Sequence, residues 1–160
     1  MSENPQLRSL LSAFDAFGKP AVGDTGIEVL RNAGMDFNVE LQPIYRSNNG
    51  GAVKDGSRFR RVTRPDTQAT LGVVSSGFVP YQPREMSGLA ETIIGAGRDV
   101  AWDRVGCTHG GARMMMSFQL PDTMTFGNGD QTEEVATYFY LMNAHDGSSG
   151  LKIVPSPVRL

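Results

Sequence analysis

Cysteine is nearly absent from this sequence, which has Cys107 alone among 160 residues. A single cysteine cannot form a disulfide within the chain, and the sequence has no Cys-x-x-Cys pair and no Cys/His spacing typical of a zinc site. This cysteine content favours a reducing compartment, so we expect a cytoplasmic protein.

Long apolar runs and nucleotide-binding loops are also missing. No window approaches the roughly 20 apolar residues of a membrane span, and the N-terminus has neither the basic region nor the apolar core of a secretory signal. The phosphate-loop and dinucleotide patterns do not occur. We therefore expect no membrane association and no cofactor.

Histidine is scarce as well. Only His109 and His145 occur, and both lie beside turn glycines. A hydrolytic metal site needs several His and Asp ligands from different elements. His145 and Asp146 remain weak candidates for a metal site. The preferred interpretation of "NAHDGSSG" is a hairpin turn in which Asn143 and Asp146 bond local amides.

The composition is that of one globular domain over residues 1–160, with 39% hydrophobic residues. Helix signals come first. An apolar stripe predicts a helix over residues 5–18. Thr25 and Glu28 form a capping box that predicts a second helix, ended by Gly34. A third helix is expected to begin at Pro83 and to end at Gly95 or Gly97.

Strand patterns fill most of the remaining sequence. Turn chemistry is expected at 47–57, 64–66, 109–111, 126–129 and 146–149. The strands are expected at 37–45, 58–63, 68–76, 99–107, 112–120, 133–142 and 151–160. The predicted fold class is α+β, with a mainly antiparallel twisted sheet, a β-β-β-α core and short N-terminal helices. The last strand is expected to be an exposed edge or a partner surface.

Positive charge is concentrated in one stretch of this acidic chain. The cationic residues between positions 46 and 64 are Arg46, Lys54, Arg58, Arg60, Arg61 and Arg64. Against them stands Asp55 alone, so the stretch carries +5 and the other residues together carry −7. Alternation along a strand would put Arg58, Arg60 and Arg64 on one face and Arg61 on the other. Such a row of guanidinium groups suits successive phosphates, and it equally suits a solvated sheet face.

Two aromatic residues in "GFVPYQP" follow the basic stretch. An aromatic side chain beside a basic strand is a usual arrangement for binding single-stranded nucleic acid. Phe78 is expected to pack in the core at a strand-to-helix corner. Tyr81 is a candidate for stacking on a base.

Three stretches together resemble a known family. "GIEVLRNAGMDFNVELQPIY", "TLGVVSSGFVPYQPREM" and "LMNAHDGSSGLKIVPSPVRL" are similar to the phage and plasmid-like proteins of domain-of-unknown-function family 932. The resemblance implies a phage, prophage or plasmid origin and therefore a host-cell cytoplasm. It implies no catalytic residue. It also implies that relatives continue into a further helical region beyond "PSPVRL".

The expected arrangement of three strands, a helix and a basic hairpin is also similar, at the level of the fold, to the core of single-strand annealing proteins. Those proteins assemble into rings and hold single-stranded DNA in a basic groove. The leading hypothesis is thus a non-enzymatic, homo-oligomeric protein that binds single-stranded DNA or RNA and anneals strands during recombination. The alternatives are a module that inhibits a host defence or replication protein, and a metal-dependent nuclease.

Overall fold

A six-stranded antiparallel sheet forms the centre of the structure, a computed structural model that describes residues 18–56, 58–95, 97–128 and 131–159. Its strand order is β1-β7-β8-β10-β11, and β9 pairs with the other half of β10. The bounds are β1 Lys19–Pro20, β7 Ala101–Thr108, β8 Arg113–Gln119, β9 Met124–Asn128, β10 Gln131–Ala144 and β11 Lys152–Arg159. A short 3₁₀ turn, η1 (His109–Gly111), joins β7 to β8.

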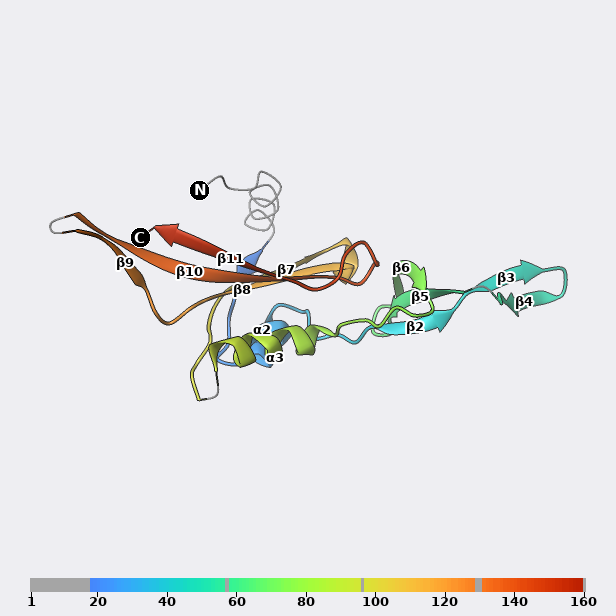
Figure 1. Cartoon of the computed structure of the whole chain (residues 1–160). Coiled ribbons are helices and arrows are strands. Elements are labelled where there is room, and N and C mark those ends of the chain that lie inside the picture. The colour runs from blue at the N-terminus through green and yellow to red at the C-terminus, as the bar shows by residue number, and fades with distance from the viewer. Residues whose placement is uncertain (1–17, 57, 96, 129–130, 160) are drawn as a thin grey trace.

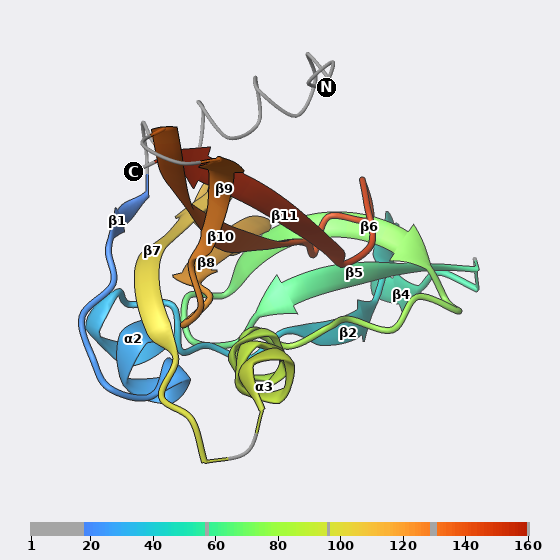
Figure 2. The same cartoon turned by 60° about the vertical axis from the view of Figure 1, so that its left-hand side comes forward.

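Two helices, α2 (Gly26–Asn32) and α3 (Pro83–Ile94), cover one face of this sheet (Figures 1 and 2). Burying apolar side chains between the two layers is the main stabilising term of such a fold. The fully buried side chains there include Leu30 and Met86 from the helices and Met116, Phe118 and Leu141 from the sheet. The α+β class with mainly antiparallel pairing is confirmed.

The helix predictions are confirmed where the chain is described. The Oγ1 of Thr25 accepts from the Glu28 amide at 3.3 Å, and the Glu28 carboxylate accepts from the Thr25 amide at 3.2 Å, which is the predicted capping box. Helix α3 begins at Pro83 and is capped by Gly95. The helix predicted over 5–18 lies outside the described residues.

A long ribbon leaves the central sheet and ends in a free hairpin (Figure 1). Its base is a three-stranded sheet in the order β2-β5-β6, formed by Glu40–Pro43, Phe59–Arg64 and Ala69–Ser75. Its tip is the hairpin of β3 (Tyr45–Asn48) and β4 (Gly51–Lys54), in which every residue is exposed. We call residues 40–64 the basic arm.

The structure corrects two sequence predictions of turns, one on the arm and one beside β10. Residues 47–57 were expected to be turn only, but they contain β4 and part of β3, and the turn itself is confined to Asn49–Gly50. Residues 126–129 were also expected to be a turn, but β9 extends to Asn128. Both segments are rich in glycine and asparagine, which have a low intrinsic preference for strands. Pairing with a neighbouring strand outweighs that preference, so the sequence pattern predicted a turn where the structure has a strand.

The outer edge of β11 is a poor template for a further strand. The Leu120 amide donates to the Thr137 carbonyl at 2.9 Å, so the main-chain groups of Thr137 point toward β8. Its β11 partner Pro157, and Pro155 two residues before, therefore turn their nitrogens toward the outer edge. Proline has no N–H there, so main-chain pairing of a partner along β11 is disfavoured. The edge is exposed, as expected, but it is protected.

None of the helices in the described part of the chain has both the length and the apolarity needed to cross a bilayer.

Candidate nucleic-acid interface

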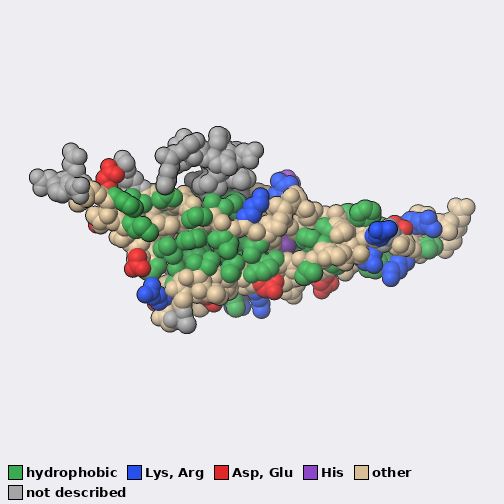
Figure 3. Space-filling model, viewed as in Figure 1, with side chains coloured by type: hydrophobic (Ala, Val, Ile, Leu, Met, Phe, Trp, Pro, Cys, Tyr) green, Lys and Arg blue, Asp and Glu red, His purple; other side chains and the backbone are tan. Residues whose placement is uncertain are grey.

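Exposed cations gather on the basic arm (Figure 3). Arg46 and Lys54 lie on the hairpin at the tip, Arg58 precedes β5, and Arg61 lies within it. All four residues are exposed. Within the described residues, no salt bridge joins Arg46, Lys54 or Arg58 to a carboxylate. The arm thus presents positive charge to solvent in a protein of net charge −2.

Two aromatic side chains on the arm are also exposed, and the sequence interpretation missed both of them. Tyr45 is 59% exposed and lies directly opposite Lys54 in the hairpin. Phe59 is 55% exposed and lies two residues before Arg61, on the same face of β5. Each ring therefore has a cation beside it, the arrangement in which a base can stack while its phosphate is neutralised. The available signal was an aromatic residue at the start of β3 and of β5, in "PIYR" and "SRFRR".

Arg64 does not belong to this exposed surface. Its guanidinium bonds both carboxylate oxygens of Asp66, at 2.6 and 3.1 Å, and donates to the Gly110 carbonyl at 2.8 Å. It also lies 3.8 Å over the ring of Phe37. Its side chain is only 12% exposed. Arg64 therefore ties the base of the arm to η1, and we remove it from the candidate phosphate contacts.

The predicted alternation of the arginines holds only in part. Arg60 pairs with Val74 and lies on the face of β5 that carries the fully buried Val62, so Arg60 is half-buried. Its Nη1 donates to the Phe59 carbonyl at 2.8 Å. Arg61 points to the opposite face and donates to the Gln42 side chain at 2.8 Å. A bulge after Val62 then shifts the register before Arg64, so a simple alternation cannot describe the whole strand.

Tyr81 and Gln82 connect the arm, helix α3 and the central sheet. Tyr81 packs partly buried against the core, and burial together with the nearby Glu85 carboxylate raises the pKa of its hydroxyl. The Gln82 side chain accepts from the Val39 amide and donates to the Val39 carbonyl, both at 2.9 Å. Tyr81 is thus a structural residue rather than the stacking candidate. Phe78 packs against the core, as expected.

His145 is fully buried where these segments meet. Its Nδ1 lies 2.8 Å from the Gly111 carbonyl, and its Nε2 lies 3.0 Å from the Tyr81 carbonyl. Asn143 also donates to the Tyr81 carbonyl, at 2.9 Å, instead of bonding a local amide as the sequence suggested. Both ring nitrogens of His145 therefore face protein groups. We call the contact between β6, Tyr81–Gln82, η1 and His145–Asp146 the junction.

Asp146 closes the turn after β10. Its carboxylate accepts from the Ser148 amide at 2.9 Å, as expected, and from the Nε of Arg113 at 3.0 Å. Burial alone would raise the pKa of this carboxyl, but the bonds from Ser148 and Arg113 outweigh it and lower the pKa. Across the described residues, no group of three or more His, Cys, Asp or Glu side chains is placed to hold a metal ion.

Gly72 lets β6 approach this turn closely. A Cβ built at Gly72 would lie 2.7 Å from the Cα of Asp146. Gly72→Ala is therefore expected to lower the free energy of unfolding by about 1–3 kcal/mol, because rigid backbone must move. Gly88→Ala is the matched control. Gly88 lies in the interior of α3 with open space around it, so this change is expected to raise stability by up to about 1 kcal/mol. Urea unfolding distinguishes the two, and equal effects would contradict the close contact.

Acid is expected to weaken the contact between the two helices and the loop that follows α2. The hydrogen bonds from Arg84 to Asp36, at 2.6 and 3.0 Å, hold the pKa of that carboxyl below its usual value of about 3.9. A lowered folded-state pKa stabilises the protein above the unfolded-state value and loses that contribution as the pH falls through it. The urea midpoint should therefore fall between about pH 5 and pH 3. Asp36→Asn should reduce that fall, and an unchanged pH dependence would contradict it.

The fold and the candidate site together define the class of protein. It is an α+β domain in which helices cover an antiparallel sheet and a basic arm protrudes. The family model of a domain of unknown function, DUF932, matches residues 70–160, more than half of the chain, so the chain belongs to this family. Neither a curated protein nor a solved structure shows significant similarity to it.

The matched range contains most of the junction but not the basic arm. It includes "LGVVS", "YQP", "HDGSS" and "PSPVR", the motifs that carry the resemblance in the sequence. The first three of these motifs meet at Gly72, Tyr81 and His145–Asp146. Packing thus brings these three motifs into contact. The arm ends before residue 70, and the first stretch of the sequence resemblance, from Gly26 to Tyr45, also lies outside the match.

Proposed function

We propose that this chain is a non-enzymatic protein of phage or plasmid origin that binds single-stranded nucleic acid along its basic arm. The observation that carries the proposal is the pairing of exposed rings with exposed cations on a protruding ribbon: Tyr45 with Lys54, and Phe59 with Arg61. Arg46 and Arg58 add charge along the same ribbon. Cations would neutralise phosphates, while each ring stacks on a base without regard to its identity.

A duplex suits this surface less well. In duplex DNA the bases are stacked inside and their faces are not available to the two rings, so only the charges would contribute. A single strand uses both the charges and the rings. Strand annealing in recombination and assembly into a homo-oligomer extend the same proposal, because holding a strand with its bases accessible is the step that annealing requires.

The test is a fluorescence anisotropy titration of a labelled single-stranded oligonucleotide, with the matching duplex as comparison. We expect saturable binding that is tighter for the single strand and that weakens as salt rises, because each neutralised phosphate releases a counterion. No saturable binding at low salt, or tighter binding of the duplex, would overturn the proposal.

A second candidate function is a protein-interaction module that inhibits a host protein. It is favoured by apolar side chains exposed on β9 and β11: Met124, Phe126, Ile153 and Val158. The proline-protected edge of β11 argues that such a partner would dock through side chains rather than by adding a strand. A purified host protein that co-elutes after nuclease treatment, and is lost with Phe126→Asp, would support this alternative.

The nuclease alternative gains no support from the junction. His145 is fully buried, and both of its ring nitrogens contact protein groups. Asp146 bonds Ser148 and Arg113. Neither ring nitrogen of His145 is therefore directed toward an open position, and each Asp146 oxygen already accepts a hydrogen bond.

A further inference from the structure

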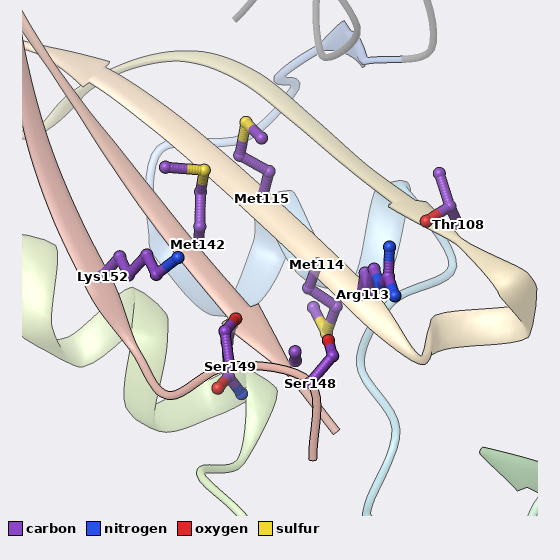
Figure 4. Close-up of a pocket in the computed structure, with 10 residues that line it drawn as sticks. Thr108, Arg113, Met114, Met115, Met142, Ser148, Ser149 and Lys152 are labelled. Carbon is purple, nitrogen blue, oxygen red and sulfur yellow. The ribbon is translucent and has the colours of Figure 1, made fainter. Parts of the chain in front are cut away.

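A pocket of about 530 Å³ lies on the central sheet, and no arm residue is among the described residues that line it (Figure 4). It is lined by Thr108, Arg113, Met114, Met115, Met142, Asn143, Ala144, Ser148, Ser149 and Lys152. Register places Met115, Met142 and Lys152 in one row across β8, β10 and β11. Arg113 and Ala144 form the row two residues along, so their side chains project from the same face.

The floor of the pocket is apolar. Met115 and Met142 are cross-strand partners that are each more than nine-tenths buried, and their side chains lie next to each other in Figure 4. Two adjacent thioethers form an adaptable, polarisable surface, and sulfur makes favourable contacts with aromatic rings. A flat aromatic group therefore fits this floor.

The rim of the pocket is cationic and rich in hydroxyl groups. Lys152 lies on one side of the floor and Arg113 on the other, and none of the described residues that line the pocket is a carboxylate. Arg113 uses its Nε for Asp146, which fixes its position and leaves further N–H donors for an anion. Thr108, Ser148 and Ser149 add hydroxyl groups that can bond a sugar or a base edge.

We propose that this pocket binds a nucleoside monophosphate, with the base on the two methionines and the phosphate at Lys152 or Arg113. The volume lies in the range of about 300–1,000 Å³ usual for small-molecule sites. An acyl chain with one head group would leave the polar groups around the floor unused, whereas a nucleotide offers a ring, hydroxyls and an anion. The site is separate from the arm and does not depend on nucleic-acid binding there.

The experiment is isothermal titration calorimetry of the full chain with three probes: adenosine 5′-monophosphate, adenosine and inorganic phosphate. We expect one saturable site for the monophosphate and at least about tenfold weaker binding of the other two, since each lacks one half of the recognition. No saturable binding of the monophosphate, or equal binding of either fragment, would overturn the proposal.

Two charge reversals locate the binding. Lys152→Glu is expected to weaken binding of the monophosphate by at least about tenfold, because it replaces an attraction at the rim by a repulsion. Arg98→Glu, in the loop after α3 and outside the pocket, is expected to leave it unchanged. Both residues are exposed, so both variants should keep the wild-type urea midpoint. If Lys152→Glu leaves binding unchanged, or if Arg98→Glu weakens it equally, the nucleotide does not bind at this rim and the pocket assignment is wrong.

Discussion

His145→Ala is expected to lower the free energy of unfolding by about 3–5 kcal/mol, the largest effect on stability that we predict. The imidazole is fully buried and lies within hydrogen-bonding distance of the Gly111 and Tyr81 carbonyls. Its removal leaves a cavity and takes away the ring that contacts the Gly111 carbonyl, while the Tyr81 carbonyl keeps its hydrogen bond from Asn143. Urea unfolding followed by circular dichroism measures the change.

The second histidine supplies the control. His109 is exposed in the η1 turn at a φ of 52°, a conformation that asparagine tolerates. His109→Asn is therefore expected to change stability by less than about 0.5 kcal/mol. If the two variants prove equally stable, the junction does not depend on His145, and a functional role for this residue regains weight.

Reversing three arm charges is expected to weaken binding of a single-stranded oligonucleotide by about 100-fold or more at about 0.1 M salt. The variant combines Arg46→Glu, Lys54→Glu and Arg58→Glu. None of these side chains forms a salt bridge with a described carboxylate, so the change should leave the fold intact. Each lost phosphate contact removes a released counterion, and each new carboxylate repels the strand. Anisotropy at constant salt gives the ratio of affinities.

A matched variant separates local charge from net charge. Lys19→Glu, Arg31→Glu and Arg98→Glu change the total charge by the same amount but lie outside the arm. We expect this variant to weaken binding by less than about tenfold, since screening limits the reach of charges beyond about 10 Å at 0.1 M salt. Equal losses in the two variants would show that binding follows net charge and not the arm.

Local signals in the sequence predicted much of the fold. The capping box at Thr25, the proline start and glycine end of α3, and the Asp146 turn each depend on residues within a few positions of one another. Alternation predicted β8 and the face that carries Met116 and Phe118. Such features depend on the local backbone geometry of a short segment and can therefore be predicted from that segment alone.

The roles that the sequence did not predict depend on distant partners. Arg64 contacts Gly110, and Asn143 contacts Tyr81, across 46 and 62 residues of chain. No local pattern distinguishes these side chains from an exposed arginine or a turn asparagine. The exposure of Tyr45 likewise depends on how far the ribbon projects, which pairing and packing decide. The clustering of charge in the sequence predicted where the cationic surface lies. Packing in the folded structure determines which of those cations are exposed.

The central claim is that the arm cations contact phosphates, and the salt dependence of binding tests it most directly. The measurement is the slope of log affinity against log salt for a single-stranded oligonucleotide, with wild-type protein and with Lys54→Ala/Arg58→Ala. Each phosphate contact contributes about −0.7 to the slope for a single strand. We predict a slope that is shallower by about 1.4 in the double variant. An unchanged slope would contradict the account, because these cations would then not contact the phosphates.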